Sequence, residues 1–190
     1  MLLWTAQTTE AYNTLIHSGA YHCDESKIID FEWWKPAYDW IAQKMKEQIG
    51  DPPEGVNYPV WLWYRWKGKN KKPDLRAHRS FGEKGTKLML IEVEVPDNEV
   101  VLSDFDNWHS VLNDTYSYTQ TTDEKEFDEV YEWLQSLPEE QRKQEIHKSW
   151  ESIFDISIWD TDFSRNGIWV QATVWELRKE YIRKAYPFVC

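Results

Sequence analysis

The sequence predicts an α+β fold in a single domain, 1–190, with a mostly antiparallel sheet and packed helices. Three observations lead to this prediction. Strand-like and helix-like apolar patterns alternate as a strand, two helices, three strands, further helices and a last strand. The connection between two of these strands is too short for a crossover helix. The chain has 190 residues, 41% of them hydrophobic, which is enough for one substantial core.

The N-terminal part predicts a strand followed by two helices. The apolar run 2–6 is typical of a buried strand, and Thr8 or Thr9 can cap the helix that follows. Gly19 is placed to end that helix. We expect a second helix with Pro36 in its first turn, because apolar residues recur after it at helical spacing.

Three strands are predicted in the middle of the chain. Residues 60–67 alternate between two faces, and residues 88–95 place apolar side chains at every second position. A turn at 96–98 leads into a strand at 100–104. We expect 100–104 to pair with 88–95 as an antiparallel hairpin.

The C-terminal part predicts further helices and one last clear strand. Apolar stripes at 127–137 and 146–153 have helical spacing, and 160–167 is polar and typical of a loop. Residues 168–175 alternate as a strand. A short helix is predicted at 179–185.

Charge is distributed unevenly along the chain. The net charge is −11, but residues 58–87 contain nine Lys or Arg against Asp74 and Glu83, a local balance of +7, so the remainder carries −18. An acidic protein does not wrap a polyanion with its whole surface, so any contact with nucleic acid is local. The 13 Trp residues must pack in the core or line a cleft.

Cysteine content and hydropathy indicate the compartment. Two cysteines, Cys23 and Cys190, do not make a disulfide framework. The first residues show no charged segment before a cleavable apolar core, so we expect no leader, and the sequence has no apolar run of membrane-spanning length. We therefore expect a reduced, cytoplasmic protein without a membrane partner.

The basic stretch is the first candidate site. One strand face carries Trp61, Trp63 and Arg65, and the loop after it offers Arg76 and Arg79 as bidentate phosphate ligands. The tryptophans can stack on a base or a nicotinamide ring. The alternative is a solvated loop whose charges offset the acidic surface.

Three further side chains are candidates for catalysis. Asp104 and Asp106 can share the end of a strand, where they can hold a cation or act in acid–base chemistry. A helix cap is the favoured alternative for this segment. Gln171 lies on an aromatic-rich strand face, where it either binds a ligand or occupies an exposed edge. The histidines show no zinc-ligand spacing, so no metal site is predicted.

The segments SDFDNWHSVLN and PDLR, together with several longer ones, resemble a bacterial family called domain of unknown function 3841. The resemblance covers nearly the whole chain, and its most specific parts are SDFDNWHSVLN and PDLR. It also rests on LLWTAQTTEAYNTLIHSGAY, on AYDWIAQKMKEQIG followed by PPEGVNYPVWLWY, and on VQATVWEL. The family name implies no activity.

A second resemblance is to the ADP-ribosyltransferase-like fold. The opening strand and helix ending in glycine, and the late strand in VQATVWELRKEYIRKAY, are similar to its first and final units. In that family a His or Arg on the first strand grips NAD, and a Glu on the late strand stabilises the ribose cation. The matching positions here are Thr5 and Gln171. Thr5 supplies no cation and Gln171 no negative charge, which favours binding or altered chemistry.

Two functions follow as hypotheses. One is a divergent NAD- or nucleotide-binding domain, with the ligand between the Trp4–Thr5 strand, the 61–65 face and Gln171, and Arg76 on a phosphate. The other is a non-enzymatic module that binds RNA or single-stranded DNA through 58–87. A third, blander option is recognition of a basic protein by the acidic remainder.

Overall fold

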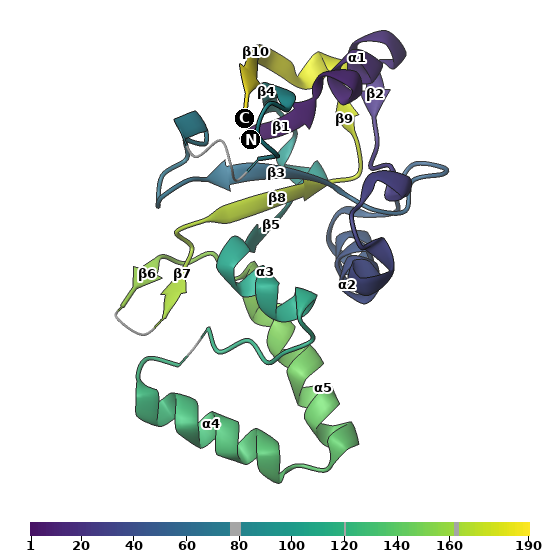
Figure 1. Cartoon of the computed structure of the whole chain (residues 1–190). Helices are drawn as coiled ribbons and strands as arrows, with labels where there is room; N and C mark the ends of the chain where they lie inside the picture. Colours follow the sequence, from purple (N-terminus) through teal and green to yellow (C-terminus); the bar gives the residue numbers. More distant parts are fainter. Residues whose placement is uncertain (77–80, 120, 162–163) are drawn as a thin grey trace.

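A computed structural model of the chain describes residues 1–76, 81–119, 121–161 and 164–190 (Figure 1). The fold is α+β, as predicted. The described helices and strands follow one another in this order: β1 (Leu2–Thr8), α1 (Thr9–Ser18), β2 (Ala20–Tyr21), α2 (Phe31–Ile49), β3 (Val60–Arg65), β4 (Lys87–Glu94), β5 (Val101–Asp104), α3 (Phe105–Leu112), α4 (Glu124–Ser136), α5 (Glu139–Ser149), β6 (Trp159–Asp160), β7 (Arg165–Asn166), β8 (Val170–Val174), β9 (Leu177–Arg178) and β10 (Ile182–Val189). Short 3-10 turns connect several of them.

A six-stranded sheet forms the centre of the molecule, with the strand order β10-β4-β1-β3-β8-β5. Each neighbouring pair is antiparallel. Two small sheets lie outside it, one made by β2 and β9 and the other by β6 and β7. The predicted antiparallel sheet is therefore confirmed.

The two faces of the sheet are covered by different helices. On one face, Leu62 of β3 and Ala172 of β8 pack with Leu15 of α1 in the first core. On the other face, α2 and α3 pack around Trp108, and α2 also packs against Val101 of β5. Since side chains alternate along a strand, β3 contributes Leu62 to the first core and Trp61 to the core on the other face.

The predicted start of the chain agrees with the structure, apart from the beginning of the second helix. The Thr8 side chain caps α1 by accepting a hydrogen bond from the Ala11 N–H, and Gly19 ends the helix in the left-handed region. Helix α2 begins at Phe31, so Pro36 lies inside the helix and not in its first turn. The apolar positions before Pro36 were not recognised as helical because prolines are commonest at the first helical position.

The predicted hairpin between 88–95 and 100–104 is wrong. β5 pairs with β8, and β4 lies between β1 and β10. The four antiparallel steps that separate β4 from β5 make these two strands run in the same direction. The short connection carries the chain into another part of the sheet, with Val95 and Val100 buried in the core.

Two predictions for the C-terminal part are also wrong. Residues 179–185 do not form a helix. A single 3-10 turn at Lys179–Tyr181 leads into β10, which pairs with β4 at the edge of the sheet. The polar segment predicted as a loop contains β6 and β7, which pair as a short hairpin. An edge strand accommodates Pro187, whose missing N–H would break a central ladder.

Helices α4 and α5 extend away from the sheet (Figure 1). The apolar stripes predicted at 127–137 and 146–153 lie in α4 and in the segment formed by α5 and the 3-10 turn after it. In the described part of the chain, no helix combines the length and apolar character needed to cross a membrane.

Candidate functional site

A pocket of about 370 Å³ opens where β1 and β3 separate. The two strands pair at the single position Trp4↔Trp63. The pocket lies beside that pair, lined by Thr5, Ala6 and Gln7 of β1 and by residues 59–63. Residues from both faces of β3 line it, so the pocket follows the edge that β1 has left.

A short chain of hydrogen bonds bridges the separated strands. The Thr5 hydroxyl donates to the Trp61 carbonyl over 2.9 Å, and the Gln7 side-chain amide donates to the Thr5 oxygen over 2.8 Å. Thr5 is buried, with 2% of its surface exposed. Its hydroxyl therefore holds the strands at the separation that keeps the pocket open, and it leaves the Gln7 side chain fixed at the wall.

Gln171 lines the same pocket from β8. It stands directly opposite Trp63 of β3 on one side and Ser103 of β5 on the other. The Gln171 Oε1 atom is buried and has no hydrogen-bond partner among the described residues, and the same holds for the Ser103 hydroxyl. A buried acceptor without a partner costs about 1–3 kcal/mol, so a native structure that keeps one needs a reason for it.

Aromatic rings form the walls of the pocket. Trp61 packs against Trp108, with 5.0 Å between ring centroids, and contacts Tyr38 edge-on. Burial raises the pKa of Tyr38. The nearby Trp61 N–H opposes this shift, although it makes no hydrogen bond with the tyrosine oxygen. Trp63 packs against Trp66 and Phe105. These half-buried rings offer flat surfaces to a planar ligand.

The rim of the pocket carries one thiol, one carboxylate and one ammonium group. Burial, together with the charges of Glu25 and Asp24, raises the pKa of Cys23 to about 11, which keeps the thiol protonated and unreactive. Lys27 lies 3.5 Å from Asp24 and 3.6 Å from Glu10. The rim therefore has little net charge.

Two residues predicted to bind the ligand have other roles. Trp4 is buried and its indole N–H donates to Glu92 over 3.1 Å, outside the pocket lining. The Arg65 guanidinium donates to the carbonyls of Ile156 and Gly167 over 2.8 and 2.6 Å. Arg65 therefore ties β3 to the segment before β8, and these contacts account for its position without a phosphate.

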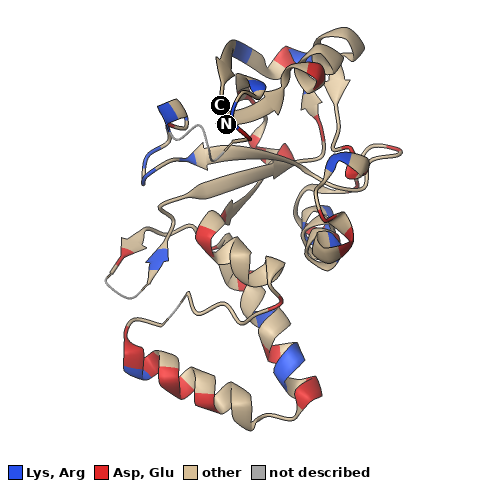
Figure 2. Ribbon diagram, viewed as in Figure 1, with Lys and Arg blue, Asp and Glu red and all other residues tan. Residues whose placement is uncertain are grey.

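The basic loop after β3, described for residues 67–76, contributes no residue to the pocket lining. Arg76 forms a bidentate ion pair with Asp74, and these hydrogen bonds hold the pKa of Asp74 well below its usual range. Arg76 is not among the residues that line the pocket. Figure 2 shows basic residues on this loop, past the end of β3. Arg79 lies outside the described residues.

Asp104 and Asp106 lie in different environments. Asp104 is fully buried and caps α3: its Oδ1 accepts from the Asn107 N–H over 2.8 Å, and its Oδ2 accepts from the Gly167 N–H over 2.7 Å. Burial raises the pKa of Asp104, and the partial burial of the Asp106 carboxyl at the start of α3 raises its pKa as well. Neither carboxylate lines the pocket with Gln171.

Several pocket residues were missed by sequence reasoning. Gln7 carried a usable signal, because it lies two residues after Thr5 and therefore on the same strand face. Tyr38 follows Pro36 in the predicted second helix, Tyr21 ends the segment LLWTAQTTEAYNTLIHSGAY, and Phe81 lies within the basic stretch 58–87. None of the three was considered as a ligand contact, although all three line the pocket. Within the described ranges, no three His, Cys, Asp or Glu side chains gather closely enough to hold a metal ion.

Comparison with known proteins gives one match. No curated protein and no solved structure matches this chain. The family model described as "Domain of unknown function (DUF3841)" matches residues 2–183, which include every described strand and helix except residues 184–189 of β10. The chain therefore belongs to the DUF3841 family.

Proposed function

We propose that this chain binds a planar, amide- or amine-bearing ring, of the nicotinamide or nucleobase class, in the pocket between β1 and β3. The observation that carries the proposal is the buried, unpartnered Oε1 of Gln171 at an aromatic-lined wall. An N–H group of the ligand would satisfy this acceptor, while the ring would lie against Trp61 and Trp63.

The size of the pocket supports one ring system as the bound part. Its volume of about 370 Å³ lies at the small end of the range typical of ligand sites, roughly 300–1,000 Å³. The phosphates of a dinucleotide would have to lie at the rim, near Lys27. Because Asp24 and Glu10 already surround this lysine, we expect the ring to provide most of the affinity.

The resemblance to ADP-ribosyltransferase-like folds supports NAD as a member of this ligand class. The two positions that the resemblance matches to NAD-handling residues, Thr5 and Gln171, line one pocket. Asp24, at the rim, is the one carboxylate among the described residues that line the pocket. Gln171, which stands opposite Trp63, is neutral and supplies no negative charge to stabilise an oxocarbenium ion. We therefore propose binding without transferase activity.

Isothermal titration with nicotinamide, NAD and ADP-ribose tests the proposal. We expect nicotinamide and NAD to bind. ADP-ribose lacks the nicotinamide ring but keeps adenine, so binding of ADP-ribose far weaker than that of NAD would assign the pocket to the nicotinamide ring, and comparable binding would assign it to the nucleobase. Gln171→Met keeps the length of the side chain and removes the acceptor, so it should weaken nicotinamide binding roughly tenfold.

Arg76→Ala is the matched control for this titration, because Arg76 lies outside the pocket lining. We expect it to bind nicotinamide as the wild type does. The absence of binding heat at millimolar nicotinamide and NAD would contradict the proposal. So would equal affinities of the wild type and Gln171→Met.

A further inference from the structure

Helix α4 leaves much of its apolar stripe uncovered. Among its residues Leu134 alone is fully buried, whereas Tyr131 and Trp133 are 48% and 42% exposed. Helix α5 has no buried residue. A helix of this length needs an apolar face packed against something, so an incompletely covered stripe indicates a surface that receives a partner.

A groove of about 820 Å³ lies beside this stripe. Its lining comes from α4, from α5 with the turn after it, and from the segment 116–118. None of its described lining residues belongs to the pocket between β1 and β3. The groove is therefore a second site, independent of the proposed ring-binding function.

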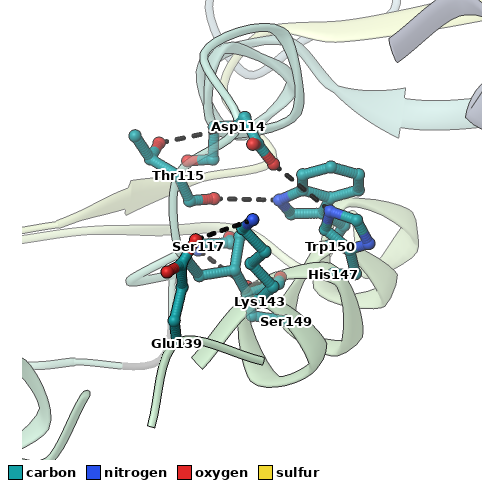
Figure 3. Close-up of polar contacts among 10 residues, drawn as sticks. Asp114, Thr115, Ser117, Glu139, Lys143, His147, Ser149 and Trp150 are labelled. Carbon is teal, nitrogen blue, oxygen red and sulfur yellow. Dashed lines mark hydrogen bonds and ion pairs between the residues drawn. The ribbon is translucent and has the colours of Figure 1, made fainter. Parts of the chain in front are cut away.

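The wall of the groove is held firmly against α5 (Figure 3). The Trp150 indole N–H donates to the Thr115 carbonyl over 2.8 Å, and the Ser117 N–H donates to the Ser149 hydroxyl over 2.9 Å. Asp114 pairs with His147 over 3.2 Å at the same junction. These contacts fix the segment that carries the groove's tyrosines, so the surface exists before any partner arrives.

A row of aromatic rings runs from Tyr116 and Tyr118, which line the groove, to Phe127 and Tyr131 of α4, which lie outside its lining. Tyr116 and Tyr118 lie 5.0 Å apart between ring centroids, and Phe127 lies 4.4 Å from Tyr118. Tyr131 continues the row, stacked at 6.4 Å from Phe127. The faces of such rings attract guanidinium and ammonium groups as well as aliphatic chains.

Negative charge surrounds these rings. The carboxylates among the described lining residues are those of Glu126, Glu129, Glu145, Glu151 and Asp155, whereas one lining residue, Lys148, is basic. Acidic residues run along the length of α4 in Figure 2. The pairs Lys44–Glu151, Lys125–Glu129 and Lys148–Glu145 neutralise part of this charge. Glu126 and Asp155 form no ion pair among the described residues, so the groove stays acidic.

We propose that this groove binds a basic segment of another polypeptide, in which arginine or lysine alternates with aliphatic residues. The aliphatic side chains would pack on Trp133 and Val130, and the cations would meet the carboxylates and the tyrosine faces. Nucleic acid and anionic lipid are disfavoured because their charge is that of the groove itself.

Fluorescence anisotropy with a labelled peptide of alternating arginine and leucine tests this proposal on the full chain. We expect binding that weakens with added salt, and no binding of a matched peptide in which glutamate replaces arginine. Glu129→Gln and Glu145→Gln should each weaken binding by about threefold. Trp133→Ala should weaken it further.

Glu132→Gln and Glu140→Gln are matched controls, because they remove charges of the same helices outside the groove lining. They should leave peptide affinity unchanged. If Trp133→Ala fails to fold, the glutamine variants still decide. Equal loss in control and groove variants would overturn the proposal, as would the absence of peptide binding. Self-association in sedimentation that the groove variants abolish would overturn it in favour of a second copy.

Discussion

Gln171 sets the chemistry of the pocket because its side-chain oxygen is buried without a partner among the described residues. A side chain kept in such a position for ligand binding lowers the stability of the free protein. The neighbouring Thr5 differs, because its hydroxyl is engaged with Trp61 and Gln7 and therefore stabilises the fold. Stability measurements can separate these two kinds of polar residue.

We predict that Gln171→Met leaves the free energy of unfolding unchanged or raises it by up to about 1 kcal/mol, because the variant removes an unsatisfied buried acceptor. Thr5→Val is the matched comparison, and it should lower the free energy of unfolding by roughly 1–2 kcal/mol because Gln7 loses its acceptor. Urea unfolding of the three proteins gives both values. A loss from Gln171→Met as large as that from Thr5→Val would show that Gln171 is structural.

Gly167 is a second residue on which local geometry depends. Its φ of +68° is a left-handed conformation, and an added Cβ would lie 2.6 Å from the carbonyl oxygens of Ile156 and Ser157. The Gly167 carbonyl accepts a hydrogen bond from the Arg65 guanidinium, and the Gly167 N–H donates one to the Asp104 carboxylate. The strand β3, the cap of α3 and the segment before β8 therefore meet at this glycine.

We predict that Gly167→Ala destabilises the protein by about 2–3 kcal/mol, from backbone strain and from the clash with two carbonyl oxygens. Gly55→Ala is the control, because Gly55 also has a positive φ but has open space around its Cα. It should cost about 1 kcal/mol. Thermal unfolding of both variants checks this, and equal losses would refute the role assigned to the carbonyls.

Among the elements, the small sheet of β2 and β9 holds one wall of the pocket. Ala20 and Tyr21 pair with Arg178 and Leu177, and Tyr21 lines the pocket. The Glu176 carboxylate links the two strands of this sheet, because it contacts His22 just after β2 and Arg178 of β9. Burial raises the pKa of its carboxyl, but hydrogen bonds from Arg178 and His22, at 2.6 and 2.9 Å, outweigh burial and hold the pKa below its ordinary value.

This lowered pKa predicts a pH dependence. The folded state binds the Glu176 proton less well than the unfolded chain, so its stabilising contribution is present above the ordinary pKa, about 4.3, and is lost as pH falls through the folded pKa. Glu176→Gln should therefore cost about 1 kcal/mol at pH 7 and progressively less below about pH 4. Urea unfolding across this range measures the difference. A loss independent of pH would contradict the assignment.

Elements defined by local signals were predictable, and elements defined by distant partners were not. The Thr8 cap, the Gly19 stop and the alternation of β3 depend on neighbouring residues. β10 depends on β4, and no nearby residue specifies that pairing. At the site, strand alternation brought Trp61, Trp63 and Gln171 into consideration. The role of Arg65 was missed because its carbonyl partners lie 91 and 102 residues further along the chain.

For the whole molecule, the described basic side chains of the stretch 58–87 lie outside the linings of both proposed binding surfaces. The basic stretch 58–87 carries +7 against −18 elsewhere, but its lysines do not line the pocket. The ring-binding pocket lies between β1 and β3, and the acidic groove lies on the projecting helices. Substitutions can therefore alter the basic stretch, the pocket or the groove one at a time.

We predict that neutralising Lys69, Lys71 and Lys72 together to glutamine leaves nicotinamide affinity unchanged within about twofold, because none of the three lines the pocket. Titration at low and high salt checks this. Strong binding of single-stranded RNA by the wild type, lost in the triple variant and falling steeply with salt, would assign the basic stretch to nucleic acid instead.

The central claim is that Gln171 receives a ligand N–H in the pocket between β1 and β3. A crystal structure of the chain grown with nicotinamide tests it most directly. The account predicts a ring against Trp61 and Trp63, with its amide nitrogen within hydrogen-bond distance of Gln171 Oε1. An empty pocket at saturating nicotinamide, or a ring bound elsewhere with Gln171 unpartnered, would contradict it.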